Sequence, residues 1–331
     1  MTSSLMKFIG ESTGTPIEPL IERHLDKNGN KLDMEKFRRY IRSRKPRSKA
    51  YNGPFVFVNN AIIEQAKHII AHNKDTSYEE AIQFSYCNIM EHYITELWNH
   101  TKQIYEIDKQ FAEDLFQTEA DLIPFEAFAH LPYNTFCIDY DFSVHGMRCE
   151  GLVVDVYIDG KIVTVTAVGV FDGNKHGLFA NEYDFRKGMC KVNEDPDKKN
   201  RDPVPMPEVN AIWNIICQLC MFLSQPKPDD VVKAKPSSNH GKKKQKVKDV
   251  SKWEVGFRYG QAIKNMVKPK TESTTTQSTG KTHASPKPHV RKAHWQHYHV
   301  GKGRKQIVTK WISPVLVNTN TGDGIITTCH K

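Results

Sequence analysis

The sequence contains no long apolar run. No stretch reaches the roughly 18 apolar residues that a membrane-spanning helix needs, and residues 1–10 lack the apolar core of a secretory signal peptide. We therefore expect a cytoplasmic protein that has no membrane partner.

The number of cysteines is odd, and the spacing between them is not that of a metal site. Of the seven cysteines, Cys217 and Cys220 form a C-x-x-C pair, but no second Cys pair or Cys/His pair lies at zinc-finger distance. The pair also falls within an apolar stretch that is typical of a buried helix. The cysteines are therefore predicted to be buried, unpaired thiols of a reducing compartment, and we expect neither a metal site nor a cofactor.

Acidic residues are scarce in one long segment of the chain. Residues 233–305 hold 19 Lys or Arg against the three acids Asp249, Glu254 and Glu272, while the whole chain has a formal net charge of +9. The rest of the chain is thus acidic overall. A positive charge concentrated in one segment favours a polyanionic partner, either a nucleic acid or a ribonucleoprotein. A solubilising tail is the alternative interpretation.

The hydrophobic pattern predicts an α+β fold. Spacing with a period near 3.6 predicts helices over 61–72 and 77–116, and a strongly apolar stretch predicts a buried helix over 208–223. Period-2 alternation predicts four strands, at 135–142, 151–158, 161–170 and 178–185. We expect the helical N-terminal part to pack on one face of a central antiparallel sheet.

Composition divides the chain into four parts. They are a basic N-terminal arm, a core domain of helices and sheet, a basic linker with one short helix, and a His/Trp-rich C-terminal β-hairpin. In order, they span residues 1–50, 51–228, 229–285 and 286–331. Asn52-Gly53-Pro54 predicts a turn at the first boundary. The linker helix is predicted over 253–267, and Gly301 and Gly303 are predicted to form the hairpin turn.

Histidine and tryptophan cluster in the C-terminal hairpin, between cationic side chains. Cations suit phosphate contact and aromatic rings suit base stacking, which predicts a binding surface made of His289, Arg291, His294, Trp295, Tyr298, Lys302, Arg304 and Trp311. On this interpretation, Trp295→Ala abolishes function and leaves the fold intact. A purely structural hairpin, metal binding by the imidazoles, and metal-independent RNA cleavage by His294 and His297 are the alternatives.

A longer pattern runs through the same hairpin. It consists of Pro288-His289-Val290-Arg291, His294-Trp295, Tyr298, Gly301-x-Gly303 and Trp311-Ile312-x-Pro314 with Val317-Asn318. This pattern resembles the C-terminal signature of a phage- and plasmid-encoded family of type V-A anti-CRISPR proteins. Weaker similarity extends through Leu131-Pro132 with Phe136–Asp139, Trp213–Leu223 and Trp253–Ile263. The resemblance spans residues 125–318.

The resemblance implies that the chain suppresses production of a CRISPR effector nuclease in the cytoplasm of a bacterial host cell. It implies binding to the nascent N-terminal peptide of the effector at the ribosome, followed by loss of the effector's mRNA. The basic segments suit contact with the ribosome or the mRNA. From the residues alone, a metal-independent ribonuclease and a basic nucleic-acid-binding regulator of a mobile element stay open, although no helix-turn-helix can be placed.

Overall fold

The structure is a computed structural model. It describes residues 53–73, 75–118, 120, 122–144, 146–172, 175–192, 206–226, 228, 230–234, 250–267, 289–304 and 306–317. The predicted N-terminal arm and most of the predicted linker lie outside these described residues. Within the described residues, no helix is long and apolar enough to cross a membrane.

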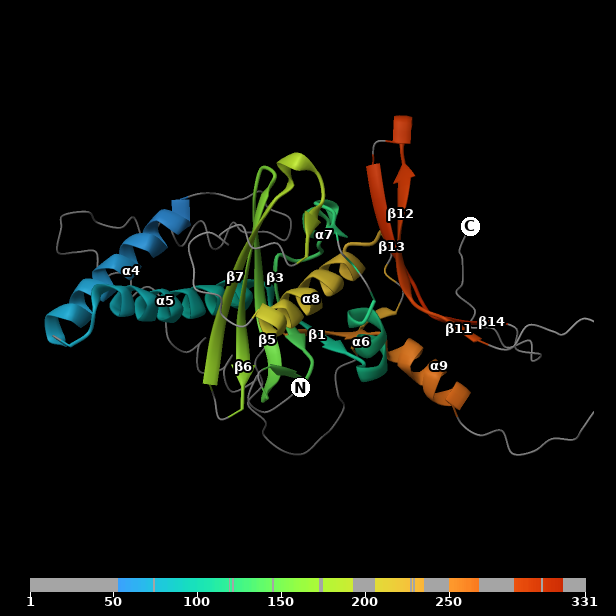
Figure 1. The fold of residues 1–331 in the computed structure, drawn as a ribbon, viewed down its shortest axis with the longest axis horizontal. Helices are drawn as coiled ribbons and strands as arrows, with labels where there is room; N and C mark the ends of the chain where they lie inside the picture. The colour runs from blue at the N-terminus through green and yellow to red at the C-terminus, as the bar shows by residue number, and fades with distance from the viewer. Residues whose placement is uncertain are drawn as a thin grey trace, which may run out of the picture.

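An eight-stranded sheet forms the centre of the molecule (Figure 1). Its strands are β1 (Gln103–Ile107), β3 (Thr135–Asp139), β4 (Phe142–Val144), β5 (Met147–Asp159), β6 (Ile162–Phe171), β7 (Lys175–Asp184), β9 (Val231–Lys233) and β10 (Ser251–Val255). The order is β7-β6-β5-β3-β1-β10-β9, and β4 pairs with β5. A separate short ladder joins β2 (Leu122–Ile123) to β8 (Cys190–Lys191).

The sheet is mixed rather than purely antiparallel. β5, β6 and β7 form the predicted antiparallel meander, and β3 and β4 also pair antiparallel with β5. β1 instead lies parallel to both β3 and β10. The predicted α+β class with a central sheet is therefore confirmed, while the antiparallel prediction does not extend to the two pairs that β1 forms.

Helices cover both faces of this sheet (Figure 1). The described helices are α4 (Gly53–His72), α5 (Tyr78–Thr101), α6 (Lys109–Phe116), α7 (Glu126–Ala129), α8 (Met206–Leu223) and α9 (Phe257–Val267). Of these, α4 packs on α5 and α9 packs on α6. α5 packs Ile94 and Trp98 against one face of the sheet, where they meet Cys137 and Val153. α6, α7 and α8 cover the opposite face around buried rings such as Phe111. The predicted packing of N-terminal helices on the sheet is thus confirmed.

The helix predicted over 77–116 is two helices separated by a strand. Ser77 caps α5, and the helix ends at Lys102, whose backbone adopts a left-handed φ of 51°. The chain then runs as β1 between β3 and β10, and Asp108 caps the N-terminus of α6. Four of the five residues of β1 are buried, so the strand lacks the polar–apolar alternation that marks a half-exposed strand. The apolar spacing alone could not reveal the break.

Two other predicted boundaries differ from the structure. α4 begins at Gly53, inside the tripeptide that we predicted to be a turn, since Pro is tolerated in the first turn of a helix. The segment predicted as a helix over 253–267 starts as strand β10 and becomes helical only at Phe257. Gly256 joins the two with a φ of 76°, and a Cβ at this position would lie 2.1 Å from Phe111 Cγ. The strand-to-helix turn therefore requires glycine.

The described cysteines are free thiols, as predicted. Cys87 is half-buried and the others are buried. Burial raises the pKa of Cys149 and of Cys217 to about 12. Cys217 lies in the core next to Tyr183, whose hydroxyl is 3.3 Å from the sulfur. The C-x-x-C pair is therefore part of the packed interior, and Cys329 lies outside the described residues.

Candidate functional site

The C-terminal segment forms the predicted hairpin, which stands out from the body of the molecule (Figure 1). Its antiparallel strands are β12 (His294–Val300) and β13 (Gln306–Ile312). Gly301 and Gly303 lie in the turn between them with φ of 80° and 73°, as predicted. The hairpin is thus a projecting element with two faces.

Strand alternation sorts the predicted site residues between these two faces. Trp295 lies directly opposite Trp311, and His297 lies opposite Thr309, so these four residues share one face. Regular alternation along one strand predicts a common face for Arg291, Trp295, His297 and His299. The register confirms it for Trp295, His297 and His299, whereas Arg291 belongs to a separate strand, β11 (His289–Arg291). The other face carries His294, Gln296, Tyr298 and Lys310.

Trp311 attaches the hairpin to the core through three aromatic rings. Its ring centroid lies 5.2 Å from that of Phe111, 5.7 Å from Tyr259 and 6.2 Å from Phe222, all in edge-to-face geometry. The indole N–H also donates a hydrogen bond of 3.1 Å to Thr118 Oγ1. These rings come from α6, α8 and α9, so the base of the hairpin contacts three helices.

Trp295 attaches the hairpin to α8 through a buried amide. The half-buried indole of Trp295 packs against the core and donates a hydrogen bond to Gln218 Oε1. Gln218 is fully buried, and its Nε2 donates a hydrogen bond of 2.6 Å to the Thr118 carbonyl. Neither Thr118 nor Gln218 was predicted from the sequence to belong to the site. The sequence did contain a signal for Gln218, because it is a glutamine within a strongly apolar predicted helix. A buried amide needs hydrogen-bond partners, so such a residue indicates a polar contact in the interior.

The half of the hairpin away from the core is exposed and basic. His297, Tyr298, His299, Lys302 and Arg304 are all exposed there. The Lys310 ammonium lies 5.9 Å from the ring centroid of Tyr298, within range of a cation–π contact. Residues 273–322 contain no Asp or Glu. Of the predicted binding residues, Tyr298, Lys302 and Arg304 therefore lie at the exposed tip, without nearby acids in the sequence of the hairpin.

The structure does not bring His294 and His297 together. They lie on opposite faces of β12, since three positions separate them along one strand. His297 Nδ1 is 2.9 Å from Thr309 Oγ1. Partial burial, assisted by the neighbouring His299, lowers the pKa of His297 below its ordinary value of 6.5. This shift favours the neutral form of the imidazole.

Two of the predicted binding residues lie beside the hairpin in a second ladder. β11 (His289–Arg291) pairs antiparallel with β14 (Val315–Val317). The backbone of this ladder is described, but the side chains of His289 and Arg291 lie outside the described part of the structure. Among the described residues, no group of three or more His, Cys, Asp or Glu is placed to hold a metal ion.

A pocket that the sequence analysis did not predict lies at the edge of the sheet, by the C-terminal end of α8. Its volume is about 540 Å³, within the range of ligand-binding sites. Aromatic rings and prolines dominate its lining, among them Tyr105, Tyr133, Trp253, Pro132, Pro226 and Pro228. These residues are spread between positions 105 and 253, so only folding brings them together.

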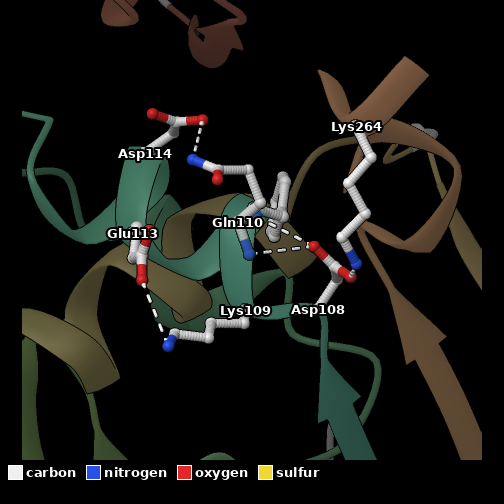
Figure 2. Close-up of polar contacts among 7 residues, drawn as sticks. Asp108, Lys109, Gln110, Glu113, Asp114 and Lys264 are labelled. Atoms are coloured by element: carbon white, nitrogen blue, oxygen red, sulfur yellow. Dashed lines mark hydrogen bonds and ion pairs between the residues drawn. The ribbon is translucent and has the colours of Figure 1, made fainter. Parts of the chain in front are cut away.

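Figure 2 shows how polar contacts join the start of α6 to Lys264 of α9. Asp108 Oδ1 accepts hydrogen bonds from the backbone N–H groups of Gln110 and Phe111, at 2.9 and 3.2 Å. Its other oxygen lies 3.8 Å from the Lys264 ammonium on α9. Gly260 of α9 approaches the same carboxylate so closely that a Cβ would lie 2.0 Å from Oδ1. This junction positions two of the rings that Trp311 contacts.

The fold and the site define an α+β protein with an aromatic pocket at the sheet edge and a docked, projecting basic hairpin. The chain belongs to the anti-CRISPR type V subtype A2 family, whose model matches residues 105–319. The predicted family is thereby confirmed. No curated protein matches the chain.

The matched range includes most of the features described above. It begins at Tyr105 in β1, earlier than the 125–318 range of the predicted resemblance, and it ends just after β14. It therefore contains the sheet, the pocket and the hairpin, whereas α4 and α5 precede it. Membership of this family supports an anti-CRISPR function for the chain.

Proposed function

We propose that this anti-CRISPR protein lowers production of a type V CRISPR effector nuclease. It binds the N-terminal peptide of the nascent effector at the ribosome, and the effector's mRNA is then lost. Family membership supports the anti-CRISPR part of this proposal. The surface carries an aromatic pocket and, separately, a basic hairpin. These two places suit two chemically different partners, a peptide and an RNA, which supports the proposed binding of a nascent peptide at the ribosome.

The exposed tip of the hairpin is the observation that carries the proposal. Trp295 and Trp311 are used to dock the hairpin, while Tyr298, Lys302 and Arg304 stay exposed to solvent. Cations and an aromatic ring on a projecting element suit contact with phosphates and unstacked bases of ribosomal or messenger RNA. The separation of His294 from His297 favours binding of RNA over its cleavage.

Co-expression with a type V effector tests this function. The effector carries either its own N-terminal codons or codons for an unrelated N-terminal peptide, and both effector protein and effector mRNA are followed. We expect the wild-type protein to lower both, and the unrelated peptide to restore both. The double variant Lys302→Glu/Arg304→Glu is expected to lose most of the effect, because it places acidic groups where phosphate contact is proposed.

A matched control separates this contact from net charge. Lys175→Glu/Lys187→Glu makes the same change of charge at exposed positions of β7 and the segment after it, away from the hairpin. This control is expected to act like the wild type. Unchanged effector protein and mRNA with the wild-type chain would contradict the proposed function. Full activity of the Lys302→Glu/Arg304→Glu variant would contradict RNA contact by the tip alone.

A further inference from the structure

The pocket lies beside the outer edge of β9. β9 is the last strand of the central sheet, and in the part of the chain that the structure describes it pairs only with β10. The Ala234 N–H donates a hydrogen bond of 2.8 Å to the Lys252 carbonyl. Main-chain groups alternate in direction along an antiparallel strand. Val231 and Lys233 therefore direct their N–H and C=O groups away from β10.

The pocket is continuous with this edge and contains an unsatisfied donor. Val231 of β9 and Trp253 of β10 both line it. Gln225 lines it as well, and its Nε2 is buried with no hydrogen-bond acceptor among the described residues. A buried amide without an acceptor is unfavourable. An acceptor group on a ligand in the pocket would satisfy this donor of Gln225.

We propose that an extended peptide binds here by adding a strand to β9, with one large apolar side chain in the pocket. A carbonyl of this peptide accepts the hydrogen bond from Gln225. The inference rests on the proposed function, and it places the N-terminal peptide of the effector at β9 and the pocket.

The chemistry of the site favours a peptide over a nucleic acid. Strand addition uses main-chain hydrogen bonds for affinity and a neighbouring pocket for specificity. A volume of about 540 Å³ accommodates a large aromatic or aliphatic side chain. The lining residues that the structure describes include no Lys or Arg, so they offer little to a phosphate backbone. Every lining residue falls within the range matched by the family.

Substitutions at Lys233 test strand addition directly. The probe is a fluorescent synthetic peptide that copies the N-terminal segment of the effector, and the protein is the full chain. Lys233→Pro removes the outward N–H and keeps the ladder to β10, because proline is tolerated on an edge strand where the N–H faces away. Lys233→Ala removes the same side chain and keeps the N–H. The Lys233 ammonium lies 5.9 Å from the ring centroid of Trp253, so Lys233→Ala serves as the reference for loss of the side chain. We expect Lys233→Pro to bind the probe at least about tenfold more weakly than Lys233→Ala.

Two further measurements locate the peptide. Replacing the large apolar residues of the probe by serine is expected to abolish binding, because the pocket is then left unfilled. Hydrogen exchange at the amides of Val231 and Lys233 is expected to slow when the peptide is added. Circular dichroism establishes that both Lys233 variants are folded.

The outcomes distinguish this inference from the function on which it rests. If the wild-type chain binds the probe and both Lys233 variants bind equally well, strand addition at β9 is overturned and the proposed function stands. If the β9 amides are already protected without peptide, a segment of the chain itself occupies the edge, which also overturns the inference. If the wild-type chain binds no probe, recognition of the effector peptide fails and the inference fails with it.

Discussion

Gly260 of α9 lies directly against Asp108, the residue that caps the start of α6. Asp108 is buried and satisfies the first N–H groups of α6, so its carboxylate cannot move away without loss of those hydrogen bonds. Gly260 leaves space for that carboxylate because it has no Cβ. The two residues together determine how closely the helices approach.

A methyl group at position 260 is expected to destabilise the protein. Gly260→Ala places a Cβ 2.0 Å from Asp108 Oδ1, and overpacking of this kind costs about 1–3 kcal/mol. Urea unfolding followed by circular dichroism measures the loss. Gln261→Ala changes an exposed neighbour on the same helix, and we expect a change of less than about 0.5 kcal/mol. Equal stability of the two variants would show that α9 moves to relieve the contact.

The hairpin, as an element, has a docked base and an exposed tip. Trp295 and Trp311 bind its base to Gln218, Thr118 and the aromatic rings of the core. The sequence alone placed both tryptophans in a binding surface, because the identity of a residue on a strand does not say which face meets the core. The tertiary structure assigns the indoles to attachment, and it leaves Tyr298 and the turn cations exposed.

Removal of Trp295 is therefore expected to affect the fold, contrary to the expectation from the sequence. Trp295→Ala leaves the Oε1 atom of the fully buried Gln218 without its donor, which costs about 1–3 kcal/mol. Chemical denaturation measures this loss. Tyr298→Ala removes an exposed ring from the opposite face of the same strand and is expected to keep the wild-type stability. A Trp295→Ala variant with wild-type stability would contradict the described docking of the hairpin.

At the scale of the whole molecule, two histidines are expected to make the stability depend on pH. Burial lowers the pKa of His92 on α5 below its ordinary value of 6.5, and partial burial lowers that of His297. When the pKa of the folded state is lowered, the unfolded chain binds the proton first as pH falls. Well above pH 6.5 both histidines are neutral in the folded and unfolded chain, and they do not change the free energy of unfolding with pH. As the pH falls below about 6.5, protonation of the unfolded chain lowers the free energy of unfolding. Burial raises the pKa of Asp139, which acts in the opposite direction in more acidic solution.

We expect the free energy of unfolding to fall between about pH 7.5 and about pH 5.5. Urea titrations at constant ionic strength measure this fall. The double variant His92→Gln/His297→Gln is expected to show a shallower fall, because glutamine does not titrate. The same slope in the wild type and in the double variant would show that other groups cause the pH dependence.

Short sequence patterns predicted the elements whose strands pair with their neighbours in the sequence. The meander from β5 to β7 and the hairpin from β12 to β13 follow from period-2 alternation and turn glycines, and both form as predicted. β1 and β10 were missed, because their parallel pairing joins segments far apart in the chain. The pocket was missed for the same reason, since Tyr105 and Trp253 meet only after those strands pair.

The sequence by itself determined the α+β class, the buried thiols, the concentration of positive charge and the family, because composition, periodicity and motif spacing are properties of the chain. Only the tertiary structure decided which face of the hairpin packs against the core. It brought Gln218 and Thr118 beneath the two indoles and placed an aromatic pocket beside the edge of β9. These features depend on side chains that burial brings into contact across large separations in the sequence, and no local pattern records such contacts.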